Sequence, residues 1–498
     1  MSAPVSLDIR PECAVVGVYN HPNASVIAYY CLHALQHRGQ EATGIVSSYW
    51  DEARRRRRFV AYKGEGLVLE VFSHHVLQEV LIGDAAIGHN RYSTTGSSQR
   101  ANIQPFHISY RMGNLALAHN GNLTNTRQLR AWLQEEGAIF QSTTDSELFL
   151  HLIARSRQPT QVEQIREALQ QVRGAYSLVL LTDTALIAVR DPHGFRPLAL
   201  GRLPLRDGQY TYVVASETCA FDLIGAEYVR DVAPNEILVI DYDTVQSGTL
   251  KSYPIVDNPP QARHCIFEFI YFARPDSFIF GHSVDKVRRK LGKSLAEESP
   301  VRPSDPNDEV VVISVPDSGN TAAIGYAQVN QAQGIPTRFD IGLIRSHYVG
   351  RTFIAPEQDQ REFKVKTKFN IVRGVLRDKI VVVVDDSIVR GTTSKALVQL
   401  IREAGPREVH LRVTAPPIRY PCKYGMDFPS RQELIANYYD SEEQIACALG
   451  ADSLHYLSLE KLLLSVPHAP GVGYCTACFT GEYPVPIEPE ADKYVTEA

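Results

Sequence analysis

An acidic pair followed by small and hydroxyl residues stands at the end of a strongly apolar run. The run IVVVV is typical of a parallel strand buried on both faces, and Asp385 and Asp386 follow it directly. Residues 387–393 then lead into a helix-like stretch. Ligands of open α/β sheets bind at the carboxyl edge of the strands, where a helix N-terminus favours a phosphate. The pattern therefore predicts a sugar-phosphate site, whereas two aspartates alone would indicate only a helix cap.

A second apolar run ends in a similar turn. The string VVISV is followed by Asp317, Ser318 and Gly319, which we expect at the same edge of the sheet. Mg²⁺ prefers carboxylate, hydroxyl and substrate phosphate oxygens, so Ser318 is a candidate ligand. A turn without any ligand is the alternative interpretation.

The segment 342–366 combines many cations with weak periodicity. Such a segment is typical of a loop that closes over a pyrophosphate group and excludes water. Its candidate phosphate-binding cations are Arg351, Lys364 and Lys366.

The first half of the chain carries short strings whose order is more specific than any one of them. ECAVVGVYN, which contains Cys13, is followed by GHNRYSTTG, HNGNLTN and TTDSE. Together they resemble the class II glutamine amidotransferases, whose N-terminal nucleophile domain hydrolyses glutamine with a cysteine as its first residue. The resemblance implies that Cys13 is the nucleophile.

A cysteine at position 13 can use its own amine as a base only if the preceding residues are removed. A free α-amine has a pKa of about 7.7–8.0, so an appreciable fraction is neutral near pH 7 and can activate the thiol. We therefore predict that residues 1–12 are a propeptide. A small buried cysteine at the start of a strand is the alternative, and it leaves the later strings unexplained.

Acyl transfer also needs donors for the oxyanion and anchors for the charged ends of glutamine. The resemblance assigns the oxyanion hole to Asn120 and the backbone N–H of Gly121. Arg91 offers a fork suited to the α-carboxylate, and Asp145 a carboxylate for the α-ammonium. With the terminal amine as base, His89 and His119 are interpreted as structural.

The segment VDDSIVRGTTS resembles the signature of type I phosphoribosyltransferases. The residues that this resemblance and the closing loop together assign to phosphoribosyl diphosphate are Asp385, Asp386, Ser387, Ile388, Val389, Arg390, Gly391, Thr392, Thr393, Arg351 and Lys364. The predicted ligands of one Mg²⁺ per subunit are Ser318, Asp385 and Asp386.

The elements that position these residues differ between the two halves. Up to about residue 243, short β-type runs alternate with turns and with helical stretches near 25–37 and 146–154, and the proline-containing segment 246–264 is the expected linker. Later, continuous Val and Ile runs alternate with helices, as a parallel sheet requires. The predicted fold is an α+β N-terminal nucleophile αββα sandwich (13–256), followed by an α/β type I phosphoribosyltransferase domain with a parallel sheet (257–498).

Composition excludes several classes of protein. A chain of 498 residues is too long for one ordinary core, and its net charge of −5 gives no broad basic field for nucleic acid. The run 54–58 of five arginines is interpreted as a solvated loop. No apolar stretch reaches the roughly 18 residues of a membrane span, and the first twelve residues have no signal-like pattern. We expect a cytoplasmic enzyme that binds neither membrane nor nucleic acid.

Both halves in this order resemble the amidophosphoribosyltransferase family. CIFEFIYFARPDS, YVGRTFI, APPIRYPCKYGMD, QELIA and CTACFTGEYP all look like its segments. The resemblance implies the formation of 5-phosphoribosylamine, pyrophosphate and glutamate from phosphoribosyl diphosphate, glutamine and water, the first step of purine synthesis. It also implies inhibition by purine nucleotides and a homotetramer.

Eight cysteines in a cytosolic protein do not indicate disulfides. Cys475 and Cys478 form a CxxC pair, which suits zinc as well as other uses. The resemblance implies one 4Fe-4S cluster per subunit, held by Cys265, Cys422, Cys475 and Cys478. We expect Cys31, Cys219 and Cys447 in the core.

The closing loop departs from the family pattern at Ser346, His347 and Ala355. His347 stands where the family has an arginine, and a histidine carries only a pH-dependent charge. This replacement is expected to weaken diphosphate binding.

Two other functions are alternatives. One is a regulatory paralogue that binds phosphoribosyl diphosphate without transfer, and the retention of Asp385, Asp386, Arg390, Cys13 and Arg91 argues against it. The other is an amidotransferase that aminates a sugar phosphate through an isomerase domain, which the segment VVVVDDSIVRGTTS disfavours.

Overall fold

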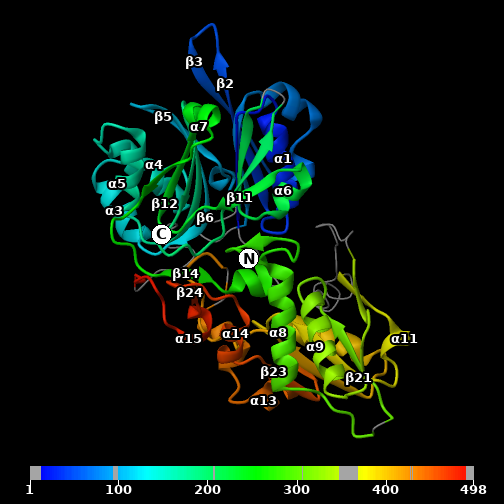
Figure 1. Ribbon diagram of the computed structural model, residues 1–498. Coiled ribbons are helices and arrows are strands. Elements are labelled where there is room, and N and C mark those ends of the chain that lie inside the picture. The colour runs from blue at the N-terminus through cyan, green and yellow to red at the C-terminus, as the bar shows by residue number, and fades with distance from the viewer. Residues whose placement is uncertain are drawn as a thin grey trace.

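The computed structural model describes residues 13–92, 99–205, 208–305, 307–346, 368–426, 428 and 430–488. The predicted propeptide (1–12) lies outside these residues. The same holds for Arg351, Lys364, Lys366, His347 and Ala355 of the predicted closing loop. Figure 1 shows two lobes, with the first half of the chain above and the second half below.

The upper lobe contains two antiparallel sheets. The first has the strand order β11 (Glu227–Asp231), β9 (Ala199–Pro204), β10 (Tyr210–Ala215), β1 (Ala14–Tyr19), β4 (Ala85–Arg91), β2 (Ala42–Asp51) and β3 (Arg56–Glu65). The second has the order β13 (Lys251–Pro254), β12 (Glu236–Asp241), β8 (Ala185–Arg190), β7 (Gly174–Thr182), β6 (Gly113–Leu123) and β5 (Phe106–Tyr110).

Apolar side chains of both sheets meet in one buried layer, which includes Val15, Ile87 and Val179. Helices cover the outer faces: α1 (Ala24–Ala34) and α6 (Cys219–Ile224) pack on the first sheet, and α3 (Thr126–Glu135), α4 (Ser146–Arg155) and α5 (Gln161–Leu169) on the second. The predicted αββα sandwich is confirmed, and both expected helical stretches are present.

The lower lobe is built on a five-stranded parallel sheet with the order β18 (Thr337–Phe339), β17 (Val310–Ser314), β21 (Ile380–Asp385), β22 (Glu408–Val413) and β23 (Ser453–Tyr456). Alternate side chains of a strand point to opposite faces. Val382 and Val384 therefore join the core under α8 (Val284–Glu298) and α9 (Asn320–Ala332), while Val381 and Val383 join the core under α12 (Thr392–Arg402) and α13 (Glu442–Leu449). This burial of both faces explains the unbroken valine run.

The segment 246–264, expected as a linker, contains regular structure. It includes the edge strand β13 and the beginning of β14 (Ala262–Cys265). β14 pairs in parallel with β24 (Val472–Cys475), so a strand close to the end of the described chain returns to the junction of the lobes. The proposed boundary between residues 256 and 257 stays a prediction.

Short elements complete the described chain. They are α2 (Val68–Val71), η1 (Val76–Val80), η2 (Arg100–Asn102), α7 (Tyr242–Ser247), η3 (Glu268–Phe272), β15 (Phe278–Ile279), β16 (His282–Ser283), β19 (Leu343–Arg345), β20 (Phe369–Ile371), α11 (Arg373–Leu376), η4 (Arg431–Glu433), η5 (Ile435–Asn437), α14 (Leu459–Ser465) and α15 (Ala477–Thr480). Within the described ranges, no helix is both long and apolar enough to cross a membrane.

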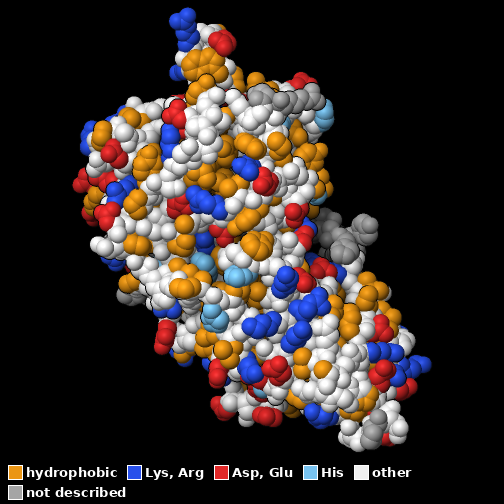
Figure 2. Space-filling view, viewed as in Figure 1, with side chains coloured by type: hydrophobic (Ala, Val, Ile, Leu, Met, Phe, Trp, Pro, Cys, Tyr) orange, Lys and Arg blue, Asp and Glu red, His pale blue; other side chains and the backbone are white. Residues whose placement is uncertain are grey.

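Of the five arginines expected in a loop, Arg54 and Arg55 lie in the turn of the β2–β3 hairpin, whereas residues 56–58 begin strand β3; the hairpin projects from the upper lobe (Figures 1 and 2). Arg57 pairs with Asp84, and the others are exposed. Cys31 and Cys219 are buried as expected. The expectation for Cys447 was wrong, because this residue lies on the exposed side of the amphipathic helix α13.

Candidate active sites

Cys13 lies immediately before β1, a central strand of the first sheet. Its side chain is buried, and its Sγ donates to the carbonyl oxygen of Tyr92 at 3.3 Å. Its own carbonyl oxygen accepts from Arg38 Nε at 3.2 Å. The small pocket beside Cys13 is lined by Cys13, Arg91, Tyr92, Gln104, His119, Gly121, Thr144, Asp145 and Ser146. The structure thus brings together residues from all four of the sequence strings.

Asn120 and Gly121 occupy adjacent positions on β6. Gly121 has φ +148°, and a Cβ on it would lie 2.0 Å from the carbonyl oxygen of Ala175, so only glycine fits. The side chain of Asn120 is buried, and its Nδ2 has no hydrogen-bond partner among the described residues. A buried unpaired donor is costly, which is consistent with a group held ready for a charged oxygen.

Arg91 and Asp145 line the same pocket as Cys13. Arg91 ends β4, and burial lowers its pKa, while electrostatic interaction with Cys13, Glu41 and Asp145 acts in the opposite direction. Asp145 caps α4, and its Oδ2 accepts from the backbone N of Leu123 at 2.8 Å. A cation and a carboxylate therefore flank one cysteine, as the charged ends of an amino acid require.

The two histidines near this pocket are fixed by other groups. His89 Nε2 lies 3.0 Å from the carbonyl oxygen of His119, and His119 Nδ1 lies 2.9 Å from Ser146 Oγ. Burial lowers the pKa of His89 to about 3 and also lowers that of His119. Both rings are consequently neutral at physiological pH, in agreement with a structural role.

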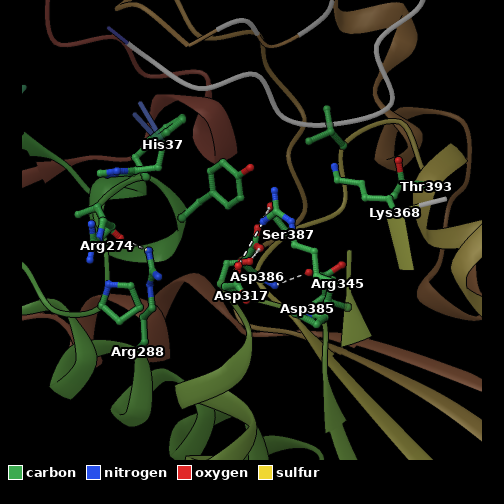
Figure 3. A pocket seen from close by; sticks show the side chains of 18 of the residues that line it. His37, Arg274, Arg288, Asp317, Arg345, Lys368, Asp385, Asp386, Ser387 and Thr393 are labelled. Carbon is green, nitrogen blue, oxygen red and sulfur yellow. Dashed lines mark hydrogen bonds and ion pairs between the residues drawn. The ribbon is translucent and has the colours of Figure 1, made fainter. Parts of the chain in front are cut away.

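The second site is a cleft of about 870 Å³ at the carboxyl edge of the parallel sheet (Figure 3). Asp385 ends β21, and Ser318 follows β17. Asp386 is buried and accepts hydrogen bonds from the hydroxyls of Ser318 and Ser387. Burial raises the pKa of Asp386, and these two donors with the charge of Arg288 oppose that change.

The turn after Asp386 places most of the predicted residues in the cleft. The lining includes Ser387, Val389, Arg390, Gly391 and Thr393. Gly391 has φ +76° and begins α12 as its N-cap, so backbone N–H groups of the helix face the cleft region. Arg390 pairs with Glu433 at 3.4 Å.

Two predicted residues of this turn do not line the cleft. Ile388 is 2% exposed and packs in the apolar core beneath α12, and Thr392 forms the first residue of that helix. Their side chains stabilise the turn and do not line the cleft. Only their backbone groups are therefore placed to bind a phosphate.

Several cleft residues were missed by sequence reasoning. Arg274, Arg288, Arg345 and Lys368 add positive charge on both sides of the acidic group (Figure 3). Arg274 belongs to the string FARPDS, whose resemblance to the family could have identified it. Arg288 is one cation among several on α8, so nothing in the sequence distinguished it.

The upper lobe contributes a wall of the same cleft. That wall includes His33, Gln36, His37, Gln40 and Tyr92. Tyr92 also lines the pocket of Cys13. The two sites therefore share a residue, which no separate reading of the two halves could reveal.

The donors in the cleft fit a magnesium ion only in part. Among the described residues, no group of three or more His, Cys, Asp or Glu side chains could hold a metal ion by itself. Mg²⁺ commonly binds one or two carboxylates together with substrate phosphates and waters. The pair of Ser318 and Asp386 with neighbouring Asp385 suits such a shared site.

The four cysteines at 265, 422, 475 and 478 line one small pocket between the lobes. Cys265 and Cys475 are register partners in the β14–β24 pair, and Cys478 lies on α15. Tyr424 N donates to Cys422 Sγ at 3.3 Å. Burial raises the pKa of Cys475 to about 12 and that of Cys478 well above its ordinary value, so thiolates here need a bound cation.

Comparisons with known proteins agree with this geometry. The model of the glutamine amidotransferase domain family matches residues 89–222. The chain is 50% identical over 484 residues to the chloroplastic amidophosphoribosyltransferase 2 of Arabidopsis thaliana, covering 97% of this chain and 81% of that protein. It is 46% identical to the amidophosphoribosyltransferase of Bacillus subtilis, covering 96% and 95%.

Two solved structures match nearly the whole chain. One is described as the allosteric regulatory enzyme of purine biosynthesis, with a TM-score of 0.86, 44% identity, and 98% and 99% of the two chains covered. The other is the glutamine phosphoribosylpyrophosphate amidotransferase of B. subtilis in complex with ADP and GMP, with a TM-score of 0.85, 45% identity, and 97% and 100% covered.

Proposed function

This chain belongs to the amidophosphoribosyltransferase family, and on that premise we propose that the Cys13 pocket and the carboxyl-edge cleft perform one coupled reaction. The reaction converts phosphoribosyl diphosphate, glutamine and water into 5-phosphoribosylamine, pyrophosphate and glutamate, the first step of purine biosynthesis. The observation that carries the coupling is Tyr92, which lines both cavities.

The glutaminase step begins at Cys13 after residues 1–12 have been removed as a propeptide. The freed α-amine takes the proton of the thiol, and the thiolate attacks the side-chain carbonyl carbon of glutamine. The amine then returns the proton to the departing ammonia. Water hydrolyses the resulting thioester to glutamate and restores the thiol.

The other residues of the pocket bind and orient glutamine. Arg91 pairs with its α-carboxylate and Asp145 with its α-ammonium, which fixes the reacting carbonyl beside Cys13. Asn120 Nδ2 and the N–H of Gly121 donate to the oxyanion of each tetrahedral intermediate. The buried, unpaired amide of Asn120 supports this assignment.

Ammonia then reaches the cleft without meeting bulk water. It passes Tyr92, whose carbonyl oxygen lies 3.3 Å from Cys13 Sγ. In the cleft it attacks C1 of the ribose, and pyrophosphate leaves from the same carbon. The upper-lobe wall of the cleft keeps the nucleophile between the two sites.

The residues of the cleft hold phosphoribosyl diphosphate at three places. Asp385 and Asp386 accept from the ribose hydroxyls, and residues 387–393 bind the 5-phosphate at the N-terminus of α12. The cations Arg351 and Lys364 are proposed to neutralise the pyrophosphate, together with Lys368 in the cleft. A Mg²⁺ ion held by Ser318, Asp385 and Asp386 would supply further positive charge to the leaving pyrophosphate.

The pocket of four cysteines is proposed to hold one 4Fe-4S cluster per subunit. Four thiolates suit a zinc ion equally well, and the resemblance of all four positions to the cluster-bearing members of the family favours the cluster. Four thiols that surround a pocket suit a larger cluster. Iron and sulfide analysis of protein purified without oxygen tests this: four of each per chain is expected, and zinc would refute it.

Regulation and assembly complete the proposal. Purine nucleotides are proposed as inhibitors, and the ADP and GMP bound to the B. subtilis relative support this. We also propose a homotetramer, a cytoplasmic location, and glutaminase and transferase domains at 13–256 and 257–498.

The coupled reaction is tested by measuring glutamate and pyrophosphate in the same tube, with protein purified without oxygen and supplied with Mg²⁺. Equal amounts of both, each requiring both substrates, are expected. Glutamine hydrolysis without pyrophosphate would instead indicate another acceptor, and phosphoribosyl diphosphate binding without turnover would indicate a regulatory paralogue.

A further inference from the structure

The loop that carries Cys422 lies against the strand that carries the proposed oxyanion donors. Asn122 Nδ2 donates to the carbonyl oxygen of Lys423 at 3.2 Å. A Cβ built on Gly425 would lie 3.2 Å from the carbonyl carbon of Gly121 and 3.4 Å from its Cα. Backbone from the second half of the chain is therefore in direct contact with the glutaminase strand β6.

This loop is held firmly by its other contacts. The ring of Tyr424 stacks on Phe195, with ring centroids 4.5 Å apart. Its hydroxyl donates to the carbonyl oxygen of Val485 at 3.0 Å and accepts from the N–H of the same residue at 2.9 Å. Its carbonyl oxygen accepts from Arg196 Nη2 at 2.6 Å. A loop fixed by two separate segments, residues 195–196 and Val485, can transmit its position to the strand beside it.

Gly121 is confined on two sides. On one side, a Cβ on Gly121 would meet the carbonyl oxygen of Ala175 at 2.0 Å. On the other side lies Gly425, which has φ +112° and whose missing side chain leaves room for Gly121 and for Arg196 Nη2, 3.3 Å from the ideal Cβ position. A methyl group at Gly425 would have to displace one of these neighbours.

We propose that Gly425 is a positioning residue for glutamine hydrolysis, because it sets the place of the Gly121 N–H from the opposite half of the chain. This inference rests on the proposed glutaminase at Cys13. It implies that the segment next to the cluster ligand Cys422 determines how well the oxyanion is stabilised in the other lobe.

The test compares Gly425→Ala with Gly450→Ala. Gly450 also has a positive φ, of +83°, but its nearest heavy atom would be 3.8 Å from the new methyl group, so it controls for backbone strain alone. Oxyanion donors act in the transition state, so Gly425→Ala should lower kcat for glutamine hydrolysis by about ten-fold or more, with a much smaller change in KM for glutamine. Synthesis from added ammonia and the iron content should stay close to those of the unmodified protein.

An unchanged kcat in folded Gly425→Ala, or an equal loss in Gly450→Ala, would overturn the proposal. If Gly425→Ala does not fold, Asn122→Ala replaces it, since it removes the amide that bonds to Lys423; its kcat should fall by about two-fold or more, and an unaltered kcat would refute the idea. Absence of glutamine hydrolysis in the unmodified enzyme would instead refute the proposed function itself.

Discussion

Cys13 owes its proposed reactivity to a free amine of its own rather than to a neighbouring base. The nearby histidines are engaged by Ser146 and by a carbonyl oxygen, and burial keeps their pKa values low. Arg91 and Asp145 are suited to bind substrate. At the scale of single residues, the roles are divided within one pocket: Cys13 reacts, and Arg91 and Asp145 anchor glutamine.

Replacing Cys13 by serine should abolish one half-reaction only. A hydroxyl is a much weaker nucleophile than a thiolate, so glutamine-dependent synthesis should fall on the order of 10³-fold. Synthesis from added ammonia needs only the cleft and should remain within about two-fold of the unmodified protein. Pyrophosphate release measured with each nitrogen donor checks this, and a parallel loss of both activities would contradict it.

His89 should make stability depend on pH in a defined direction. The unfolded chain takes up a proton on this ring near its ordinary pKa of 6.5, but the folded protein does so only near its pKa of about 3. The folded-state pKa is lowered, so stability is lost as pH falls from about 6.5 towards 3, by about 2 kcal/mol at pH 5 from this group.

The Tm of His89→Gln should therefore decrease by less between pH 7 and pH 5 than the Tm of the unmodified protein. Calorimetry at both pH values provides the measurement, and the exposed His75→Gln serves as the control because its ring has no buried environment to lose. Identical pH dependence in all three proteins would show that His89 is protonated in the folded state as well.

At the scale of elements, strand β21 and the turn after it were the most predictable part of the molecule. A valine run, two aspartates and a glycine-containing turn are local in sequence, so their placement at a sheet edge follows from chain order. Residues brought in by tertiary contact gave no such signal. His37 and Tyr92 reach the cleft from the other lobe, and Cys447 was misplaced because apolar neighbours did not reveal which side of α13 it occupies.

Gly391 connects that turn to α12, and alanine there should disrupt phosphate binding. Its φ is +76°, and an added Cβ would lie 2.3 Å from Ile435 Cδ1. Gly391→Ala should raise KM for phosphoribosyl diphosphate about ten-fold or more, because the helix N-terminus moves away from the 5-phosphate. Gly405→Ala, with a φ of +79° and nothing within 4 Å, is the matched control because it adds the backbone strain without a clash. Equal KM values in both variants would place the phosphate elsewhere.

At the scale of the whole molecule, a buried ion network joins the two lobes. Arg38 pairs with Glu217 at 2.6 Å and with Glu268 at 2.8 Å, and Arg196 lies 3.5 Å from Glu268. Arg38, Glu217 and Arg196 belong to the upper lobe, whereas Glu268 lies on η3 beyond the predicted boundary. The same Arg38 binds the carbonyl oxygen of Cys13, so the junction reaches the proposed nucleophile.

Removing one charge from this network should be costly. Glu268→Gln leaves two buried guanidinium groups short of a counter-charge and should lower the free energy of unfolding by about 3–5 kcal/mol. Glu136→Gln, which breaks an exposed pair with Arg155, should cost less than about 1 kcal/mol. Denaturant titration of both variants tests the difference, and similar small losses would mean that the interface does not depend on these charges.

The pairing of β24 with β14 also affects how the protein is made. The residues after β24 also contact the upper lobe: Thr124 Oγ1 donates to the carbonyl oxygen of Pro486 at 2.9 Å, and Gln128 N donates to Glu488 Oε1 at 3.3 Å. A ribosome delivers those residues last among the ones described. A nascent chain that already holds every residue of the glutaminase pocket therefore still lacks the contacts that Pro486 and Glu488 make with the upper lobe.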